Sequence, residues 1–500
     1  MLLKFLLNRS DWELALLSGL LTGLAYQPWS LGFLMWFGFI PLIHIWFKDG
    51  SINHGKLGYL FGITHNLIAF YWIGFNSGAS FWVVMFSLIA AVIYLGIYWS
   101  IAGWVFGKIK PFSNSIIIFP FLIVLMEWIR SFGSLGFPWG NIVLTQLDYI
   151  DLVQIIEVTG SYGITFWVIL CNVVLYMQII DFNRNKNYGL LLILGLLTIG
   201  ILGNIQKHKF ENSDQNLDVV ILQPNLDPNE KWNYKKRKET IAFMDSLHQE
   251  AINLNPDMIL LPETAYPAYL IKNRTIRKRI QSKVDSSHIP ILIGTVHSIT
   301  QSSGDKSYYN SSIFLKPEDD FVLYNKIHLV PFAEYIPLSW KFPFLNNLNF
   351  GQGNFKKGND YTVFNVDNYS FSNLICYESS IPHLVRKFAK QNIDFITIQT
   401  NDGWLGKSSG PYQHFDIARI RAIENRIPIV RSANTGISGL ILPNGKTYQE
   451  QSLDRLAVFI VSIPILETGS FYTNYGDLFV LLCLIIFLIS GPIQCIRSRF

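Results

Sequence analysis

The sequence predicts a membrane bundle of about eight α-helical spans joined to one large water-facing α/β domain. Of its 500 residues, 50% are hydrophobic and 15% are charged, whereas an ordinary soluble chain has about 25% charged residues. The charge is also unevenly placed, because residues 205–470 hold 29 of the 40 Lys and Arg and 26 of the 35 Asp and Glu. These observations exclude a wholly soluble globule, a secreted disulfide-rich module and a pure helical channel. Nucleic acid is not an expected partner, because the net charge is only +5 and no basic run is dense enough.

The membrane part is predicted from the length of its apolar runs. A helix that crosses the hydrocarbon core needs about 20 mostly apolar residues. Eight runs of about this length are bounded by charged, Pro, Gly or turn residues: 12–28, 31–47, 57–76, 81–106, 114–130, 160–180, 188–204 and 474–496. We expect the first run to stay in the mature protein, because no small-residue cleavage site follows it. The chain then divides into residues 1–210 with seven spans, the domain 211–468, and residues 469–500 with the eighth span.

The basic residues of the short loops predict which way the bundle faces. Lys and Arg are retained on the cytoplasmic side of a membrane. Here they alternate from loop to loop, so we expect both termini in the cytoplasm and the domain 211–468 on the far side, which in a bacterium with two membranes is the periplasm. The basic loops and termini contain Lys4, Arg9, Lys48, Lys56, Lys108, Lys110, Arg184, Lys186, Arg497 and Arg499.

A few polar residues interrupt the predicted spans. Glu127 and Arg130 are three residues apart, so on a helix they can form an ion pair. His65 and Asn66 either line a polar cavity or make hydrogen bonds between helices. Residues 136–140, Gly-Phe-Pro-Trp-Gly, have no helical pattern, and we expect an amphipathic re-entrant loop at the bilayer surface.

The domain 211–468 has the alternating pattern of an α/β fold. Its apolar runs predict strands at 217–222, 258–261, 291–296, 312–315, 321–324, 371–375, 395–400, 427–431 and 439–442. Apolar residues at three- and four-residue spacings predict amphipathic helices at 236–254 and 412–425. Strands alternating with helices indicate a largely buried sheet, and about 250 residues suffice for a core of its own.

The use of cysteine points to nucleophilic chemistry. Cys171, Cys483 and Cys495 lie in predicted spans, which leaves Cys376 alone in the water-facing domain. No disulfide can form within that domain, and no Cys/His spacing suits a metal, so we expect neither a metal nor another cofactor. Cys376 follows the predicted strand 371–375 directly, and the carboxyl ends of strands are where α/β domains place reactive groups.

A carboxylate and a lysine occupy similar positions at two other strand ends. Glu263 follows the strand 258–261 and Lys326 follows the strand 321–324. A carboxylate at the edge of an apolar cleft can act as a base toward a thiol, and a lysine can stabilise the tetrahedral intermediate of acyl transfer. Either residue alone would more often be a surface charge, and no histidine of the domain is singled out as a partner of Cys376. The three strand ends together favour a Glu–Lys–Cys site.

Longer motifs around these residues resemble a known family. The segments at 261–264, 324–337, 375–379 and 399–436 read LPET, YNKIHLVPFAEYIP, ICYES and QTNDGWLGKSSGPYQHFDIARIRAIENRIPIVRSANTG. They resemble the nitrilase superfamily, whose catalytic domain is an α-β-β-α sandwich. With seven spans before them and one after, they resemble more specifically the apolipoprotein N-acyltransferase family. The resemblance implies a triad of Glu263, Lys326 and Cys376.

The resemblance also implies a role for each member of the triad. Cys376 would be the nucleophile, Glu263 the general base and Lys326 the group that stabilises the oxyanion. Glu334, eight residues after Lys326, matches a second glutamate of the family's active site and would orient that lysine.

Four further residues match positions near the family's active site. Tyr377 and Glu378 follow the nucleophile, and their backbone amides would contribute to the oxyanion hole. Trp232 and Trp404 would line the acyl chain or gate its entry, with packing in the core as the alternative.

The implied reaction is an acyl transfer in two steps. A phospholipid, usually phosphatidylethanolamine, would acylate Cys376 as a thioester, and the α-amino group of the S-diacylglyceryl cysteine of an apolipoprotein would then accept the chain. The protein would be a multi-pass enzyme of the bacterial inner membrane. One alternative is a membrane-anchored nitrilase-type amidohydrolase, for which a single span or none would be expected. Another is a lipid transporter whose domain only binds a partner.

Overall fold

The computed structural model describes residues 2–48, 52–110, 115–211, 213–300, 304–337, 339, 341–342 and 354–490. Its contacts divide the chain into two compact units. The helical unit comprises Met1–Gly74, Phe81–His208 and Tyr475–Phe500, and the sheet unit comprises Phe75–Ser80 and Lys209–Asn474. The short segment Phe75–Ser80 therefore belongs to the sheet unit by its contacts, although it lies between two helices of the other unit in sequence.

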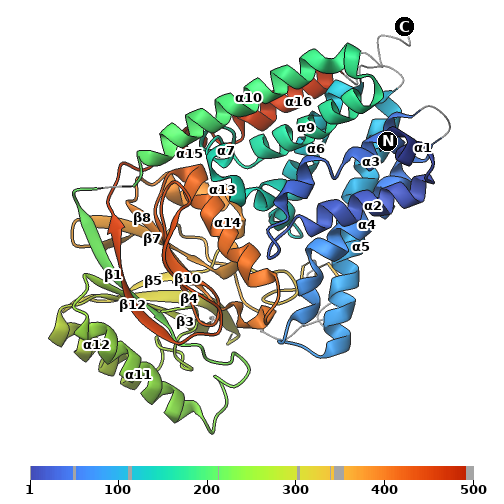
Figure 1. Cartoon of the computed structure of the whole chain (residues 1–500). Coiled ribbons are helices and arrows are strands. Elements are labelled where there is room, and N and C mark those ends of the chain that lie inside the picture. The colour runs from blue at the N-terminus through green and yellow to red at the C-terminus, as the bar shows by residue number, and fades with distance from the viewer. Residues whose placement is uncertain are drawn as a thin grey trace. The chain divides into compact units, whose positions relative to one another are not determined.

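Each of the eight predicted spans overlaps a helix of the helical unit (Figure 1). The main helices are α2 (Asp11–Leu24), α3 (Ile40–Phe47), α4 (His54–Ala69), α5 (Phe81–Ile109), α6 (Ser115–Arg130), α9 (Tyr162–Ile180), α10 (Phe182–His208) and α16 (Leu478–Ser490). Short helices add α1 (Leu2–Leu7), α7 (Ile150–Val153), α8 (Ile156–Thr159), and the 3-10 turns Gly32–Trp36 and Tyr71–Phe75.

Within the described residues, three of these helices are long and apolar enough to cross a membrane: α5, α9 and α10. The prediction of one continuous helix at 31–47 is wrong, because a 3-10 turn ends at Trp36 and α3 begins anew at Ile40. Pro41 lies in the first turn of α3, where its missing N–H is tolerated and its fixed φ favours a helix start. The run 57–76 is likewise divided, since α4 ends at Ala69.

Two charged residues of the helical unit are paired with each other. Glu127 and Arg130 are both buried and form the predicted ion pair, with Arg130 Nη2 3.7 Å from Glu127 Oε1. The same carboxylate accepts a hydrogen bond from the Ile142 backbone N–H at 2.9 Å. Pro138–Gly140 form a buried 3-10 turn, and Phe137 before it is partly buried. A re-entrant loop at the bilayer surface stays a prediction for the segment 136–140.

His65 makes a hydrogen bond between helices, which is one of the two alternatives that the sequence allowed. Its Nδ1 lies 2.8 Å from Thr22 Oγ1, which joins α4 to α2. The side chain of Asn66 instead donates to the Gly62 carbonyl within its own helix, at 2.6 Å.

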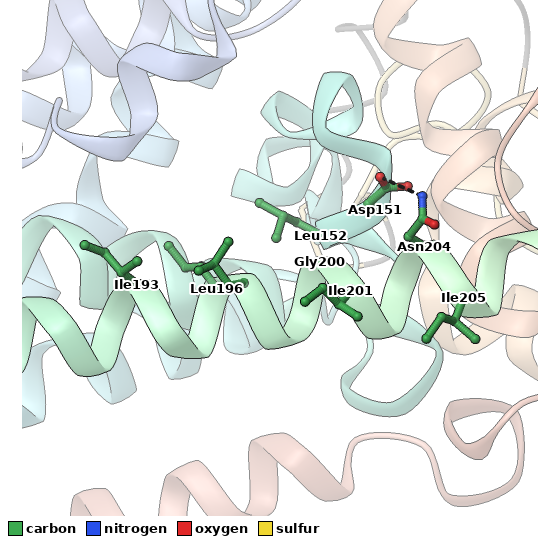
Figure 2. Close-up of a pocket in the computed structure, with 9 residues that line it drawn as sticks. Asp151, Leu152, Ile193, Leu196, Gly200, Ile201, Asn204 and Ile205 are labelled. Atoms are coloured by element: carbon green, nitrogen blue, oxygen red, sulfur yellow. Dashed lines mark hydrogen bonds between the residues drawn. The ribbon is translucent and has the colours of Figure 1, made fainter.

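A pocket of about 590 Å³ runs along α10 beside α7 (Figure 2). Its walls are mostly apolar, and the polar side chains of Asp151 and Asn204 hydrogen-bond to each other at 3.4 Å. None of the predicted catalytic residues lines it; the pocket is formed by Asp151, Leu152, Ile193, Leu196, Leu197, Gly200, Ile201, Asn204 and Ile205.

The sheet unit is built from two six-stranded sheets. The first has the strand order β12-β1-β2-β3-β4-β5 and the second β11-β10-β9-β8-β7-β6. The strands of the first sheet are β1 (Asn216–Gln223), β2 (Met258–Leu260), β3 (Ile291–Thr300), β4 (Lys306–Leu315), β5 (Val322–Asn325) and β12 (Ala457–Pro464). Those of the second are β6 (Phe364–Val366), β7 (Tyr369–Ile375), β8 (Phe395–Thr400), β9 (Ile429–Ala433), β10 (Ser438–Ile441) and β11 (Thr447–Gln451).

Helices cover the outer faces of both sheets (Figure 1). Helices α11 (Arg237–Asn253) and α12 (Arg274–Ser287) bury Met244, Leu247 and Val284 against the apolar residues of β1 to β4. Helices α13 (Pro382–Ala389) and α14 (Gly410–Asn425) lie on the side of the second sheet. The predicted α-β-β-α sandwich is therefore confirmed.

All nine predicted strands are present, but three strands and two helices were missed. Strand β6 has only three residues, and β11 is largely exposed and polar, so neither carries an apolar run. Helix α12 has five basic residues among its 14 and buries only Ile280 and Val284. Strand β12 does carry an apolar run. It pairs antiparallel with β1, and the paired residues are between 234 (Gln223↔Ala457) and 248 (Asn216↔Pro464) positions apart in sequence.

Candidate active site

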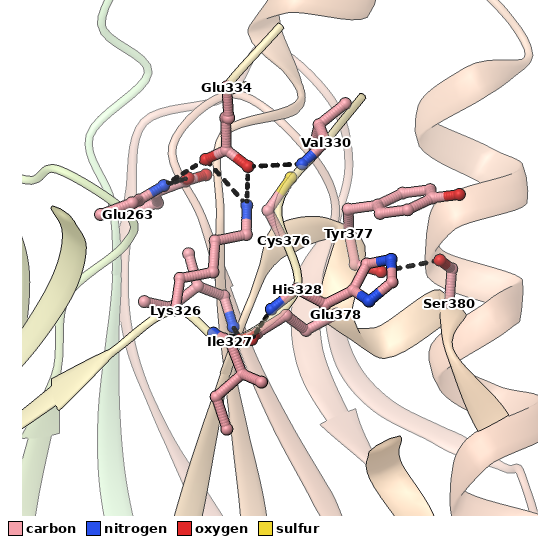
Figure 3. Close-up of polar contacts among 12 residues, drawn as sticks. Glu263, Lys326, Ile327, His328, Val330, Glu334, Cys376, Tyr377, Glu378 and Ser380 are labelled. Atoms are coloured by element: carbon pink, nitrogen blue, oxygen red, sulfur yellow. Dashed lines mark hydrogen bonds and ion pairs between the residues drawn. The ribbon is translucent and has the colours of Figure 1, made fainter. Parts of the chain in front are cut away.

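Three strand ends bring the predicted triad together (Figure 3). Glu263 follows β2 in the first sheet, Lys326 follows β5 in the same sheet, and Cys376 follows β7 in the second sheet. In Figure 3 the ammonium group of Lys326 lies beneath Glu334, with the side chains of Glu263 and Cys376 to either side. The charges of Cys376 and Glu263 both act on Lys326 and favour its charged form, which accords with this arrangement.

Asn310, in β4, joins the two glutamates. Its Nδ2 group donates to Glu263 Oε1 at 2.7 Å and to Glu334 Oε1 at 2.8 Å. One neutral amide thus separates two carboxylates that would otherwise repel each other. The backbone of Asn310 also takes part, because its carbonyl accepts the N–H of Lys326 at 2.8 Å.

Lys326 and Glu334 form a buried ion pair. Lys326 Nζ lies 2.8 Å from Glu334 Oε2 and 3.0 Å from Oε1. Burial alone would lower the pKa of Lys326, but the charges of Glu334, Cys376 and Glu263 outweigh it and raise that pKa. Glu334 is itself held by the Val330 N–H at 2.8 Å. The lysine is therefore a fixed positive charge beside the thiol.

Glu263 is held in a dry and crowded position. Its side chain is buried, and burial raises the pKa of the carboxyl, against the lowering effect of Lys326. Gly294 of β3 lies beneath the turn, where an added Cβ would sit 2.5 Å from the Pro262 carbonyl oxygen and 2.6 Å from Glu263 Cα. Only glycine lets β3 approach the base so closely.

Cys376 occupies a strained position at the junction of β7 and the 3-10 turn Cys376–Ser380. Its φ is +54°, a left-handed conformation that non-glycine residues rarely adopt and that clusters at active sites. The residue is partly exposed. Burial of its surroundings, with the charge of Glu263, raises the pKa of the thiol to about 12, so a base is needed to remove its proton.

Glu378 clamps two loops of the site together through its side chain. Oε1 accepts the backbone N–H groups of Ile327 at 2.7 Å and His328 at 3.0 Å, and Oε2 accepts that of Ile375 at 2.8 Å. The Tyr324 hydroxyl donates to the same carboxylate at 2.8 Å. Burial raises the pKa of Glu378 to about 7. The residue thereby ties the segment after Lys326 to the strand that ends at Cys376.

The aromatic residues singled out from the sequence lie around these groups. Tyr377 is buried, and its ring lies 5.8 Å from that of His328. Trp232 is 42% exposed and makes a T-shaped contact with Tyr269, so packing in the core does not explain it. Trp404 is partly exposed, and its carbonyl accepts the N–H of Ser77 at 2.9 Å.

Several residues of the site were missed from the sequence. Asn310 and Tyr324 are polar side chains within strands, a pattern that carries no signal of its own. Lys231 precedes Trp232, is buried, and has its Nζ 3.5 Å from the Glu263 carbonyl oxygen. Burial lowers the pKa of Lys231 to about 8. The only signal in the sequence was the position of Lys231 directly before Trp232.

The described part of the chain holds no cluster of three or more His, Cys, Asp or Glu side chains that could bind a metal ion. A carboxylate, a fixed cation and a thiol at three strand ends can activate the thiol, attack an acyl carbon and stabilise the resulting oxyanion. On an α-β-β-α sandwich, this arrangement defines the carbon–nitrogen hydrolase class.

Comparison with known proteins agrees with this class and narrows it. A family model described as carbon–nitrogen hydrolase matches residues 221–471, and one described as the apolipoprotein N-acyltransferase N-terminal domain matches residues 18–174. The chain belongs to the apolipoprotein N-acyltransferase family.

The relatives match along nearly the whole chain. A protein named apolipoprotein N-acyltransferase from Geobacter metallireducens is 32% identical over 95% of this chain and 93% of its own length. Proteins of the same name from Chlorobaculum tepidum and Rickettsia prowazekii are 28% and 31% identical, over 97% and 95% of this chain and 97% and 96% of their own lengths. Among solved structures, an amidase of the nitrilase superfamily from Nesterenkonia aligns with a TM-score of 0.37 and 16% identity, over 50% of this chain and 90% of that one.

Proposed function

We propose that this protein transfers an acyl chain from a phospholipid, through a thioester on Cys376, to the N-terminal α-amino group of the S-diacylglyceryl cysteine of an apolipoprotein. The observation that carries the proposal is the cluster of Glu263, Lys326 and Cys376, joined by Asn310 and Glu334. It lies in a chain that matches, over 95% of its length, a protein named apolipoprotein N-acyltransferase. The expected donor is phosphatidylethanolamine.

The first step acylates the enzyme. Glu263 takes the proton of the Cys376 thiol, and Sγ attacks the carbonyl carbon of the sn-1 ester. The Lys326 ammonium group and the backbone amides of Tyr377 and Glu378 stabilise the tetrahedral oxyanion. When the intermediate collapses, the C–O bond breaks, the lysophospholipid oxygen takes the proton from Glu263, and the thioester remains.

The second step transfers the chain to the acceptor. The α-amino group attacks the thioester carbonyl, Glu263 accepts a proton from the amine, and the C–S bond breaks. The proton returns to the Cys376 thiolate, so that Glu263 and Cys376 end as they began and an amide has formed. Water competes with the amine for the thioester, so the site must exclude it. The partly exposed Trp232 and Trp404 are placed to line or gate the acyl chain in our proposal.

The proposed setting is the bacterial inner membrane. Eight spans would place both termini in the cytoplasm and residues 211–468 in the periplasm. The alternation of basic loops supports this topology. Three helices of sufficient length and apolarity, α5, α9 and α10, support the membrane location but not the number of spans or their orientation. Both substrates carry lipid tails, so a membrane enzyme can meet them without removing those tails from the bilayer.

An intact-mass measurement tests the proposal directly. Purified protein in nanodiscs containing phosphatidylethanolamine of one defined chain should gain the mass of one acyl group, and Cys376→Ala should gain none. A diacylated lipopeptide added afterwards should remove the adduct and gain the chain itself. Release of free fatty acid without transfer to the peptide would indicate a hydrolase instead, and absence of any adduct would exclude the thioester.

A further inference from the structure

A second buried polar cluster contacts Cys376 and has no part in the chemistry above. Its charged members are Asp402 after β8, His414 in α14 and Arg431 in β9. His414 Nδ1 lies 2.7 Å from Asp402 Oδ1, and Arg431 Nη2 lies 2.8 Å from Asp402 Oδ2 and 3.1 Å from His414 Nδ1. All three side chains are at most 1% exposed.

The charges of this cluster fix which atoms donate. Burial alone would raise the pKa of Asp402, but the charges of Arg431 and His414 lower that pKa below its usual range. Asp402 is therefore a carboxylate that can only accept hydrogen bonds. His414 Nδ1 carries a proton toward it, and the ring is thereby held in one orientation, with Nε2 at the opposite edge.

That opposite edge meets the backbone of the nucleophile. His414 Nε2 lies 3.2 Å from the Cys376 carbonyl oxygen and 3.1 Å from Ser379 Oγ. A carbonyl oxygen can only accept, so Nε2 as well as Nδ1 carries a proton here, and Nε2 donates to that carbonyl. The Ser379 hydroxyl in turn donates to the Cys376 carbonyl at 3.0 Å. Thr400 links the same cluster to the side chain of Cys376. Its hydroxyl donates to Asp402 Oδ1 at 3.0 Å and also forms a hydrogen bond with the Cys376 thiol.

A carbonyl fixed in this way also fixes the amide that follows it. The peptide bond between Cys376 and Tyr377 is planar, and in a trans peptide the C=O and the N–H point in opposite directions. The strained φ of +54° at Cys376 gives this peptide an orientation that needs outside support. The Tyr377 N–H is one of the two amides assigned above to the oxyanion.

We propose that His414, held by Asp402 and Arg431, is a positioning residue for acyl transfer, which orients the Cys376–Tyr377 peptide so that the Tyr377 N–H faces the oxyanion. The inference rests on the proposed function and adds a residue that touches neither substrate nor thiol. Truncation of His414 would leave the nucleophile, base and lysine in the chain but would misalign one donor of the oxyanion hole.

Two amide substitutions separate the two contacts of the ring. In His414→Gln the side-chain amide reaches the position of Nε2 and can still donate to the Cys376 carbonyl. In His414→Asn the shorter amide reaches only the position of Nδ1 and keeps the contact with Asp402. Glu424→Gln is the matched control, because Glu424 forms a buried ion pair with Arg421 at 3.1 Å on the same helix.

The full-length variants are compared in the burst of p-nitrophenolate released from p-nitrophenyl butyrate, a small ester that requires no phospholipid site. We expect His414→Ala and His414→Asn to lower the burst rate about 10- to 100-fold, with KM within about twofold, as for one lost hydrogen bond at a charged centre. His414→Gln should stay within about fivefold of wild type. Glu424→Gln should lower the thermal midpoint and leave the rate unchanged.

Two results would overturn the positioning role. One is a burst rate in His414→Asn equal to that of wild type. The other is an equal fall in the burst rates of His414→Gln and His414→Asn, matched by equal falls in their thermal midpoints. If His414→Ala does not fold, the comparison of His414→Gln with His414→Asn still tests the positioning role. The proposed function is tested separately. If the wild-type protein shows the burst with p-nitrophenyl butyrate but is not acylated by phospholipid, the proposed donor is wrong, and the burst rates of the His414 variants can still be compared.

Discussion

At the scale of single residues, the chemistry of the site depends on neighbouring charges that set the pKa of the proposed base, Glu263. Glu263 must be ionised to take a proton, so the rate falls as pH drops through its pKa. Burial raises that pKa, while Lys326 and Lys231 lower it. Lys231 is the better residue for a test of this effect, because Lys326 has a direct part in the proposed chemistry. Lys231 Nζ lies 3.5 Å from the Glu263 carbonyl oxygen and 3.5 Å from Thr264 Oγ1.

We therefore expect Lys231→Met to move the acid limb of the pH–rate profile to higher pH. Loss of a positive charge near Glu263 raises the pKa of the carboxyl, so more of the enzyme is protonated and inactive at a given acidic pH. Lys231→Arg keeps the charge and should keep the limb in place. The measurement is kcat/KM for acylation between pH 5 and pH 9, in steps of about half a unit.

Thermal unfolding separates this effect from damage to the fold. Burial lowers the pKa of Lys231 to about 8. Below pH 8 the charged form of Lys231 therefore reduces the free energy of unfolding by about 3 kcal/mol, and this destabilisation lessens as pH rises from 8 toward 10.5. At pH 7 the thermal midpoint of Lys231→Met should thus equal or exceed that of wild type. An unmoved acid limb in a stable Lys231→Met protein would contradict the assigned role.

At the scale of elements, the site depends on strand ends that are tied together by side chains. The carboxylate of Glu378 accepts three backbone N–H groups and the Tyr324 hydroxyl. These bonds connect the segment after β5 to the end of β7, and so connect Lys326 to Cys376. A change at Glu378 should therefore disturb the geometry between two members of the triad.

We expect Glu378→Gln to destabilise the protein by about 1–3 kcal/mol, because an amide group would direct its own N–H bonds at backbone donors and leave at least one unpaired. Acylation of Cys376 should slow by at least tenfold. Tyr324→Phe is the control, since it removes one hydroxyl and leaves the three backbone bonds, and it should cost about 0.5–1.5 kcal/mol. Thermal unfolding and the intact-mass rate measure both effects, and a Glu378→Gln protein as stable and active as Tyr324→Phe would contradict the clamp.

The elements also show where sequence reasoning succeeds and where it stops. Apolar runs predicted nine strands, and three polar residues at the ends of such runs predicted the triad positions, because both signals are local. The bonds of Glu378 to Ile327 and His328 join residues about fifty positions apart, and no local pattern carries them. The sequence suggested the backbone amide of Glu378, whereas the structure shows what its side chain does.

Asn310 illustrates the same limit. In the sequence it is one polar residue in Tyr309-Asn310-Ser311-Ser312, and alternation along a strand says only which face it occupies. Its role depends on Glu263 and Glu334 arriving from other elements at 2.7 and 2.8 Å. The helical unit has an analogous case, because the division of the run 31–47 depends on Pro41 and on packing that hydropathy does not report.

At the scale of the whole molecule, the division of charge follows the division into units. The sheet unit contains residues 209–470, and with them every charged residue of the block 205–470 except Lys207. The helical unit contains the apolar runs. The segment Phe75–Ser80 is the exception, since it joins the sheet unit through the bond of Ser77 N–H to the Trp404 carbonyl and of Asn229 Nδ2 to Ser77 Oγ at 3.3 Å. A chain stretch between two predicted spans thus contributes to the unit that holds the triad.

The proposed topology places these units in different surroundings, and labelling of single cysteines tests it. In a Cys376→Ala background, Ser286→Cys adds a thiol to an exposed position of α12, and Lys186→Cys adds one to an exposed position of α10 between the sixth and seventh predicted spans. A membrane-impermeant maleimide applied to intact spheroplasts should label Ser286→Cys, because in the proposed topology the domain 211–468 faces the periplasm. Lys186→Cys should react only after the membrane is permeabilised, since positively charged loops are retained in the cytoplasm.

The parent Cys376→Ala protein measures the background from Cys171, Cys483 and Cys495. The opposite pattern of labelling would reverse the orientation, and labelling of both positions in intact spheroplasts would mean an even number of crossings between residues 186 and 286.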